Sequence, residues 1–304
     1  VSNAQAIATH VLYKAQIGNW TVTPGLRNET IKLTQDNYGS NDVNRTGANL
    51  SSRENDLSVW IPGIGAHYTS NQNLSFFGGI HKGFSPPGSS PDVDEEESVN
   101  YELGTRFVFK GIRGEVTGFF NNYSNLLGSD LAASGGGGTT DMFNAGAAHV
   151  SGLEISFTKD ILENNANWSF PITVNYTLTN TSFQNEFDSD IYGDVSIGDE
   201  IPYIAKNQWN VLAGLGHGRW EFNTTARYVG EMRTQAGNGF IPQNQRIDSN
   251  FVIDASFRYN VNNYLTLTTN IINLFDAEYA VSRQPAGLRP GHPFGINAGF
   301  TVQL

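Results

Sequence analysis

The stretch that decides the fold is residues 220–229, which read Trp-Glu-Phe-Asn-Thr-Thr-Ala-Arg-Tyr-Val. Larger or less polar side chains alternate with polar ones. One set is Trp220, Phe222, Thr224, Ala226 and Tyr228, and the other is Glu221, Asn223, Thr225 and Arg227. Successive side chains of a β-strand point to opposite faces. The pattern therefore predicts a strand with one apolar and one polar face.

The same period of two residues recurs between turn-forming residues along the whole chain. At 253–259, Ile253, Phe257 and Tyr259 alternate with Asp254 and Arg258, and 168–177 behaves alike. Read throughout, the period predicts thirteen strands, at 5–17, 20–35, 56–69, 74–85, 98–110, 112–127, 143–160, 167–183, 207–217, 220–234, 250–261, 264–279 and 293–304. The 33 Gly, 19 Phe, 12 Tyr and 5 Trp among 304 residues are typical of strands and turns, so we expect an all-β, antiparallel protein.

The connections between these strands alternate between short and long. Tight turns are predicted at 18–19, 70–73, 111, 163–166, 218–219 and 262–263, and long polar or Gly-rich loops at 36–55, 86–97, 128–142, 184–206, 235–249 and 280–292. Transmembrane β-barrels are built in this way, with short periplasmic turns and long extracellular loops. Strands of about ten residues or more can also cross a bilayer when they are tilted.

Aromatic residues fall near the predicted strand ends, where a barrel meets the two lipid interfaces. They are Trp20, Tyr68, Phe76, Trp168, Trp209, Trp220, Tyr228, Tyr259 and Tyr264. Amphipathic rings favour the headgroup depth, so they predict an aromatic girdle. The alternative is a soluble β-sandwich or propeller with an aromatic core, but its strands are shorter. A helical membrane protein is excluded, because no stretch approaches ~20 consecutive apolar residues.

Composition excludes several functions. The formal net charge is −11, from 18 Lys and Arg against 29 Asp and Glu, which gives no basic footprint for nucleic acid. The chain has no cysteine, and its six histidines are dispersed, so we expect no resident metal and no cofactor. No catalytic motif is present, and we do not expect an enzyme. Val1 to Thr9 lack the basic and apolar segments of a secretory signal.

The strand count itself carries information. In an up-and-down barrel of thirteen strands the last strand would meet the first in parallel, and bacterial single-chain barrels have even numbers. We therefore expect the sequence to be the C-terminal part of a larger barrel, unable to close alone.

Several motifs resemble one family. They are His81 to Gly88 (His-Lys-Gly-Phe-Ser-Pro-Pro-Gly), Glu97 to Arg106 with its Asn-Tyr-Glu, Trp20 to Arg27, Ser151 to Glu154, Ile201 to Tyr203, and Asn273 to Asp276 with Tyr279. In order and type they are similar to the C-terminal barrel strands of TonB-dependent outer-membrane receptors of the ferric-dicitrate and siderophore type. One departure is the terminal Leu304, where many such barrels end in Phe.

The resemblance implies the following. Residues 1–304 would be the last strands of a barrel of about 22 strands, plugged by an N-terminal domain that this chain lacks. The receptor would lie in the outer membrane of a Gram-negative bacterium and take up a ferric chelate, either ferric citrate or a siderophore complex. Energy would come from TonB through the missing N-terminal part. The alternatives are a passive porin or structural barrel, and a secreted soluble β-protein such as an adhesin.

An anionic, oxygen-rich chelate calls for Arg, Lys, Gln and His at the loop end. The final long loop holds Arg283, Gln284, Arg289 and His292 and no acid between 282 and 292, so it is the first candidate for a ligand clamp. Weaker candidates are Arg45, Arg53, Arg233, Arg246, His81 and Lys82. The alternative is that these are solvated loop charges or pair with acidic neighbours.

Acidic residues concentrate in two loops. Asp92, Asp94, Glu95, Glu96 and Glu97, with Glu186, Asp188, Asp190, Asp194, Asp199 and Glu200, make eleven of the 29 acids. They could bind a hard cation such as Ca²⁺, or form a solvated surface bridged by cations to lipopolysaccharide. They disfavour long-range attraction of citrate anions. Charges on polar strand faces are expected to pair with each other or with a plug, namely Arg27, Glu29, Glu102, Arg106, Glu115, Glu154, Arg227, Asp254 and Arg258.

Overall fold

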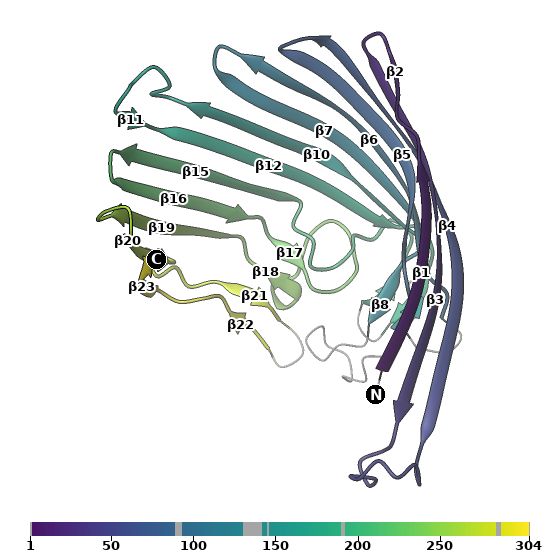
Figure 1. The fold of residues 1–304 in the computed structure, drawn as a ribbon. Helices are drawn as coiled ribbons and strands as arrows, with labels where there is room; N and C mark the ends of the chain where they lie inside the picture. Colours follow the sequence, from purple (N-terminus) through teal and green to yellow (C-terminus); the bar gives the residue numbers. More distant parts are fainter. Residues whose placement is uncertain are drawn as a thin grey trace.

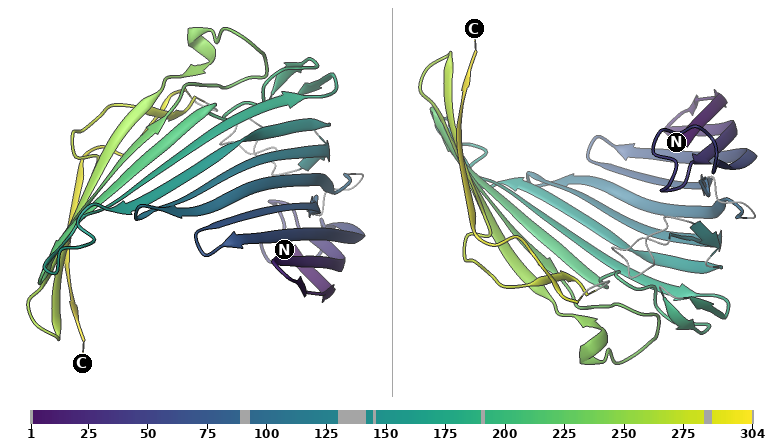
Figure 2. Two further views of the ribbon diagram at one scale, coloured as in Figure 1. Left: turned by 90° about the horizontal axis from the view of Figure 1, so that it is seen from above. Right: turned by 90° about the horizontal axis from the view of Figure 1, so that it is seen from below.

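One long, curved antiparallel sheet forms the body of the molecule in the computed structural model, which describes residues 2–88, 93–129, 142–144, 146–189, 192–283 and 287–303 (Figures 1 and 2). Thirteen strands pair in sequence order, so the predicted number and the up-and-down order are confirmed. They are β1 (Ser2–Leu12), β3 (Trp20–Asn37), β4 (Ser51–Asn71), β5 (Leu74–Ser85), β6 (Glu96–Phe109), β7 (Ile112–Asn125), β10 (Ala148–Asp160), β12 (Pro171–Phe183), β15 (Asn207–His217), β16 (Trp220–Val229), β19 (Asn250–Asn260), β20 (Leu265–Ile272) and β23 (Gly295–Val302).

The remaining elements are short. β2 (Ala15–Ile17) and β11 (Trp168–Ser169) join the sheet beside this path, pairing with β3 and β15. The long loops contain the hairpins β8 (Leu127–Ser129) with β9 (Met142–Asn144), β13 (Phe187–Ser189) with β14 (Gly193–Val195), β17 (Met232–Arg233) with β18 (Arg246–Ile247), and β21 (Ala280–Ser282) with β22 (Arg289–Pro290). A 3₁₀ turn, η2, covers Gln243–Gln245. Within the described ranges, no helix has the length and apolarity needed to cross a membrane.

The sheet stays open. β1 and β23 are its two edges and do not pair with each other in the described part of the chain. Figure 2 shows the sheet curving as an incomplete wall, with the termini at opposite sides. The expectation that these residues do not close a barrel alone is thus confirmed in the structure.

Several predicted strand limits were wrong because loops leave the sheet earlier than the period suggests. The strand expected at 264–279 ends at Ile272, since Asn273 has a φ of 50° and turns the chain away. The strand expected at 220–234 ends at Val229, and the one expected at 143–160 enters the sheet only at Ala148. Conversely, β3 and β4 run beyond their predicted limits and shorten the first loop to 38–50.

The register places the residues of the alternating apolar rows, among them Phe222, Ile253 and Phe257, on one face. Two aromatic rows cross it, one through Tyr176, Trp209, Tyr228 and Phe251, and one through Trp168, His217, Trp220 and Tyr259. Ring centroids are 5.6 Å apart for Trp209 and Tyr228, and 5.4 Å apart for Trp168 and Trp220. On each of these strands the two rows are eight residues apart, or roughly 26 Å of strand. This spacing resembles the apolar band of ~25 Å between the aromatic girdles of membrane barrels.

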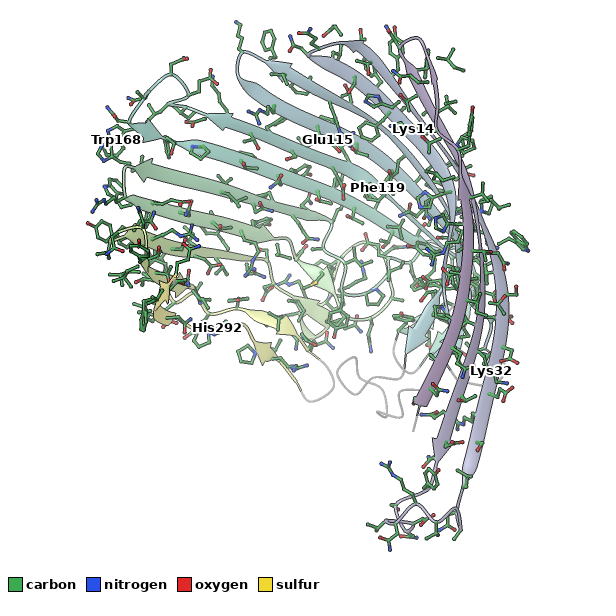
Figure 3. The ribbon with its side chains drawn as sticks, viewed as in Figure 1. Lys14, Lys32, Glu115, Phe119, Trp168 and His292 are labelled. Carbon is green, nitrogen blue, oxygen red and sulfur yellow. The ribbon has the colours of Figure 1, made fainter. Side chains whose placement is uncertain are left out.

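The opposite face is polar and carries all the strand charges predicted for it. Arg106 Nε lies 2.7 Å from Glu115 Oε2, and the Arg106 guanidinium lies 4.4 Å from the Phe77 ring centroid. Arg27 Nη2 lies 2.5 Å from Glu29 Oε1. Figure 3 labels Glu115 and Phe119, which share this face of β7, and Trp168, which lies on the other. The loops that follow β12, β16 and β20 fold toward the polar face, on the concave side of the sheet, whereas the loop between β3 and β4 extends away from it (Figure 1).

The first long loop, 38–50, is organised by one carboxylate. Asp42 is 7% exposed, and its oxygens accept the amides of Thr46 and Gly47, each at 2.8 Å, and the Thr46 hydroxyl at 3.0 Å. The amide of Thr46, ahead of the other donors, holds the pKa of Asp42 below its ordinary value. Hydrogen bonds to the ionised form favour it over the protonated form.

We expect acid to loosen this loop. A carboxyl with a lowered folded-state pKa stabilises the loop above its unfolded pKa of about 3.9, and this contribution is lost as the pH falls through the folded value. Hydrogen-exchange protection factors at Thr46 and Gly47 should therefore be constant from pH 7 to about 5 and fall below about 4. Asp42→Asn should remove the pH dependence, and protection that still falls in this variant would contradict the assignment.

Candidate functional site

The loop 184–206 folds back onto the polar face at the long-loop end. Phe183 and Ala148 are fully buried there and cluster with Val195 and Ile201. In the hairpin, Phe187 pairs with Val195, so both point to this core, while Asp188 pairs with Asp194 on the opposite side and points away from it. Burial, with a smaller effect of the Glu96 charge, raises the pKa of Tyr192, which packs against the same core.

Loop 184–206 is tied to the next long loop, 230–249. The amide of Glu200 donates to Gly237 O and that of Tyr203 to Arg233 O, each at 2.8 Å. The guanidinium of Arg233 donates to Glu200 Oε2 at 2.7 Å and to Gly239 O at 3.2 Å. Arg233 is only 4% exposed. It therefore joins the two loops through buried hydrogen bonds.

The last long loop, 273–294, is tied to loop 230–249 by a second arginine. Arg283 Nη2 donates to Gln243 O at 3.1 Å and to Arg246 O at 2.9 Å. The Arg246 side chain itself lies 2.6 Å from Asp248 Oδ1 and 3.8 Å from Glu231 Oε2. Three loops thus form one connected group, which we call the mouth and define as the described residues of 184–206, 230–249 and 273–294.

The mouth contains a polar hollow of about 410 Å³, which we call the mouth hollow. Its charged lining residues are Glu200, Lys206, Glu231 and Arg233. Thr179 and Thr181, from the end of β12, contribute hydroxyls. A hollow with several donors and acceptors can hold a polar ligand of small-molecule size.

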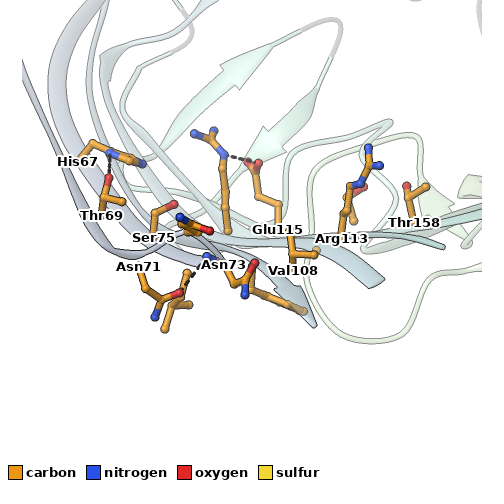
Figure 4. Close-up of a pocket in the computed structure, with 15 residues that line it drawn as sticks. His67, Thr69, Asn71, Asn73, Ser75, Val108, Arg113, Glu115 and Thr158 are labelled. Carbon is orange, nitrogen blue, oxygen red and sulfur yellow. Dashed lines mark hydrogen bonds and ion pairs between the residues drawn. The ribbon is translucent and has the colours of Figure 1, made fainter. Parts of the chain in front are cut away.

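A second hollow, of about 470 Å³, lies on the polar face at the short-turn end (Figure 4). His67, Arg113, Thr158 and the ion pair of Arg106 with Glu115 line it. Sequence reasoning placed Arg106 and Glu115 on the polar face but did not find the hollow. The register brings these positions together, but it could be used only if the order and pairing of the neighbouring strands β4, β5, β6, β7 and β10 had been known.

The predicted ligand-binding cations have different environments. Arg233, Arg246 and Arg283 lie together in the mouth, but each is engaged as described above. Lys82 forms an ion pair with Glu97. By register Lys82 lies on the apolar face, with Ile80, so it faces neither of the two hollows described above.

The other candidates also lie at the long-loop end, Arg289 and His292 within the mouth and the rest outside it. Arg289 is exposed in β22, and His292 Nδ1 lies 2.6 Å from Pro293 O. His81 pairs with Asn100 on the polar face, and Arg53 lies on the same face of β4. Arg45 is exposed in the first loop, with a φ of 54°. Gln284 lies outside the described residues.

The motif from Asn273 to Asp276 has a structural role, because it forms a set of hydrogen bonds to other segments. The Asn273 amide is 1% exposed and donates to Ala277 O and His292 O, both at 2.9 Å. Its backbone N–H donates to Asp254 Oδ1 at 2.8 Å, and Asp276 Oδ1 accepts Phe294 N at 2.8 Å. The motif thus fixes the two ends of the last loop to each other and to β19.

Within the described ranges, no group of three His, Asp or Glu side chains is placed to hold a metal ion. The features found are a curved up-and-down sheet, a banded apolar face, a polar concave face and infolded loops. Together they define the wall of a large, open β-barrel.

The family follows from comparison. Residues 3–274 match the family model "TonB dependent receptor-like, beta-barrel", and the chain belongs to this family. Among curated relatives, the vitamin B12 transporter BtuB of Vibrio vulnificus is 23% identical over 66% of this chain and 29% of its own length. The ferrienterobactin receptor of Escherichia coli is 24% identical over 84% of this chain and 34% of its own length.

Solved structures show the same fold. The siderophore receptor PiuA from Acinetobacter baumannii superposes with a TM-score of 0.74 at 18% identity, over 99% of this chain and 43% of PiuA. The unliganded ferric citrate transporter FecA gives 0.72 at 21% identity, over 99% of this chain and 45% of FecA. The chain thus spans about a third of these curated relatives and less than half of these structures.

Proposed function

We propose that this chain is part of the barrel of an outer-membrane uptake receptor for ferric chelates in a Gram-negative bacterium. The observation that carries the proposal is the family match over residues 3–274. The apolar face supports the membrane location, since exposed Trp60, Phe222, Phe257 and Phe300 would be costly in water and stable in lipid.

The ligand class rests on the relatives. PiuA is a siderophore receptor, FecA a ferric citrate transporter, and the curated relatives include a ferrienterobactin receptor. Vitamin B12 transporters are also among them, so cobalamin is the second candidate ligand. Both ligands are bulky and rich in oxygen and nitrogen, and both suit an approach through the mouth.

The polar face at the short-turn end supports the rest of the proposal. Its hollow, with the Arg106–Glu115 pair and Arg113, is suited to contact a polar domain inside the barrel. We propose that a plug occupies this side in the full-length receptor, and that uptake depends on TonB through a segment outside these residues. A passive porin would need neither.

The test is uptake of radioactive iron by cells that produce the full-length receptor. We expect uptake of at least one ferric chelate, lost when TonB is deleted. Uptake independent of TonB would favour the passive porin. Uptake of cobalamin alone would make cobalamin, and not a ferric chelate, the transported ligand.

Within the mouth we propose that Arg289 donates a hydrogen bond to the ligand. It is exposed, whereas Arg233 and Arg283 already donate hydrogen bonds that join the loops. A hydrogen bond from a charged donor is worth about 1.5–3 kcal/mol, so Arg289→Ala should weaken binding of the transported chelate at least about tenfold. Lys14→Ala, an exposed cation at the short-turn end, is the matched control. Equal affinities of the two variants would remove Arg289 from the site.

A further inference from the structure

Charge is sorted between the two ends of the sheet. By sequence, the six long connections, 38–50, 86–95, 126–147, 184–206, 230–249 and 273–294, hold 16 Asp and Glu against 6 Lys and Arg. Their net charge is therefore −10, out of −11 for the chain. The short connections carry Lys14, Lys110 and Arg219 against Glu163. The end that a ligand would enter is thus strongly negative.

Three of the five Lys and Arg residues of the mouth are already engaged, which leaves Lys206 and Arg289 against the acids of the same loops. Arg233 is buried against Glu200, Arg283 donates to backbone carbonyls, and Arg246 lies beside Asp248. An anion that recruited these guanidinium groups would have to break the contacts that join the three loops. Glu200 and Glu231 line the mouth hollow together with Lys206 and Arg233.

The hairpin of loop 184–206 adds two carboxylates on the outer side of its core. Asp188 and Asp194 pair directly across β13 and β14, and both point away from Phe187 and Val195. Like charges directly opposite each other destabilise a strand pair. Their placement gives the hairpin no stability, but it raises the negative potential over the mouth.

Taken with the proposed function, on which this step rests, we infer that the mouth selects metal chelates without net negative charge and favours cationic ones. A concave site with a net excess of one sign of charge concentrates ligands of the opposite sign and repels those of the same sign. Arg289 can still donate a hydrogen bond to the metal-bound oxygens, which carry partial negative charge even in a neutral complex.

The test is binding of three ferric chelates to the purified full-length receptor, followed by quenching of tryptophan fluorescence. The probes are cationic ferrioxamine B, neutral ferrichrome and anionic ferric enterobactin. We expect the anionic complex to bind at least about tenfold more weakly than the better of the other two at low salt. Because salt screens charges beyond a Debye length of about 10 Å at 0.1 M, added salt should weaken the cationic complex and strengthen the anionic one.

A double variant isolates the cause. Asp188→Asn with Asp194→Asn removes the facing carboxylates and should fold, because it relieves a repulsion. It should narrow the preference for the cationic over the anionic probe by about threefold or more at low salt. Glu163→Gln with Glu221→Gln removes two acids at the short-turn end and should leave the preference unchanged.

Each outcome has one meaning. Tightest binding of the anionic probe, or a preference that salt and the double variant leave unchanged, overturns the inference while the uptake function stands. If none of the three probes binds and cobalamin does, the ferric function fails, and the neutral charge class survives. If neither ferric probe nor cobalamin binds, both proposals fail.

Discussion

Arginine at Val174 should destabilise the membrane-inserted receptor by up to roughly 4 kcal/mol, the largest cost of an arginine at the bilayer midplane, whereas arginine at the neighbouring Asn175 should cost much less. Val174 lies between the two aromatic rows, paired with Phe157 and Val211, and is 38% exposed on the apolar face. In the proposed barrel that face meets hydrocarbon, where a guanidinium loses its hydration. Asn175 points to the polar face, where its Nδ2 donates to Asn210 Oδ1 at 2.9 Å.

A second pair of neighbours tests the same geometry on β16. Ala226 pairs with Val211 and Ile253 on the apolar face, and Thr225 pairs with Asp254 on the other. Arginine at Ala226 should again destabilise the inserted receptor, whereas arginine at Thr225 would lie beside the carboxylate of Asp254 and should cost less. Urea unfolding of the full-length receptor in lipid vesicles measures both pairs. Equal destabilisation at the two members of either pair would refute the assignment of the faces.

The faces could be predicted from sequence because strand geometry is local. Alternation from Trp220 to Tyr228 requires no knowledge of neighbouring strands, and the observed register places the same residues on the same face. The number of strands followed for the same reason, since short turns such as Gly218-Arg219 limit each strand clearly.

The mouth could not be predicted in this way, because its contacts join residues distant in sequence. Arg233 and Glu200 are 33 residues apart, and Arg283 and Gln243 are 40 apart. Composition marked these arginines as candidate ligand residues, but only the folded loops show that their donors are used. Lys82 is different, because it shares the parity of Ile80 and its place on the apolar face could have been inferred from the strand period.

The end of β20 shows a third kind of limit. The residues after Ile272 continue an apolar and polar pattern, and a strand to 279 was therefore expected. The chain instead turns at Asn273, whose φ of 50° is stabilised by side-chain contacts rather than by the strand period. Asn is one of the few residues that adopt this conformation at low cost. The resemblance identified the motif, and the structure supplies its physical reason.

Asn273→Ala should therefore cost about 3 kcal/mol of unfolding free energy, since it removes several buried hydrogen bonds at once. The lost partners are Ala277 O and His292 O, each 2.9 Å from the amide nitrogen, and Ala277 N, 2.8 Å from the amide oxygen. The two carbonyls and the N–H would be left without a partner in a site that is 1% exposed. Alanine also resists a positive φ, which adds about 1 kcal/mol.

Asn270→Ala is the matched control, because Asn270 is the same residue type three positions earlier, in β20, and is exposed. We expect it to change stability by less than about 0.5 kcal/mol. Asn273→Asp gives a second check, since aspartate tolerates the backbone conformation but lacks both amide donors. It should be as harmful as alanine or worse, because its charge would lie close to Asp254, whose Oδ1 is 2.8 Å from the Asn273 backbone nitrogen. If aspartate restored full stability, the backbone conformation alone, and not the amide contacts to the last loop, would account for the residue.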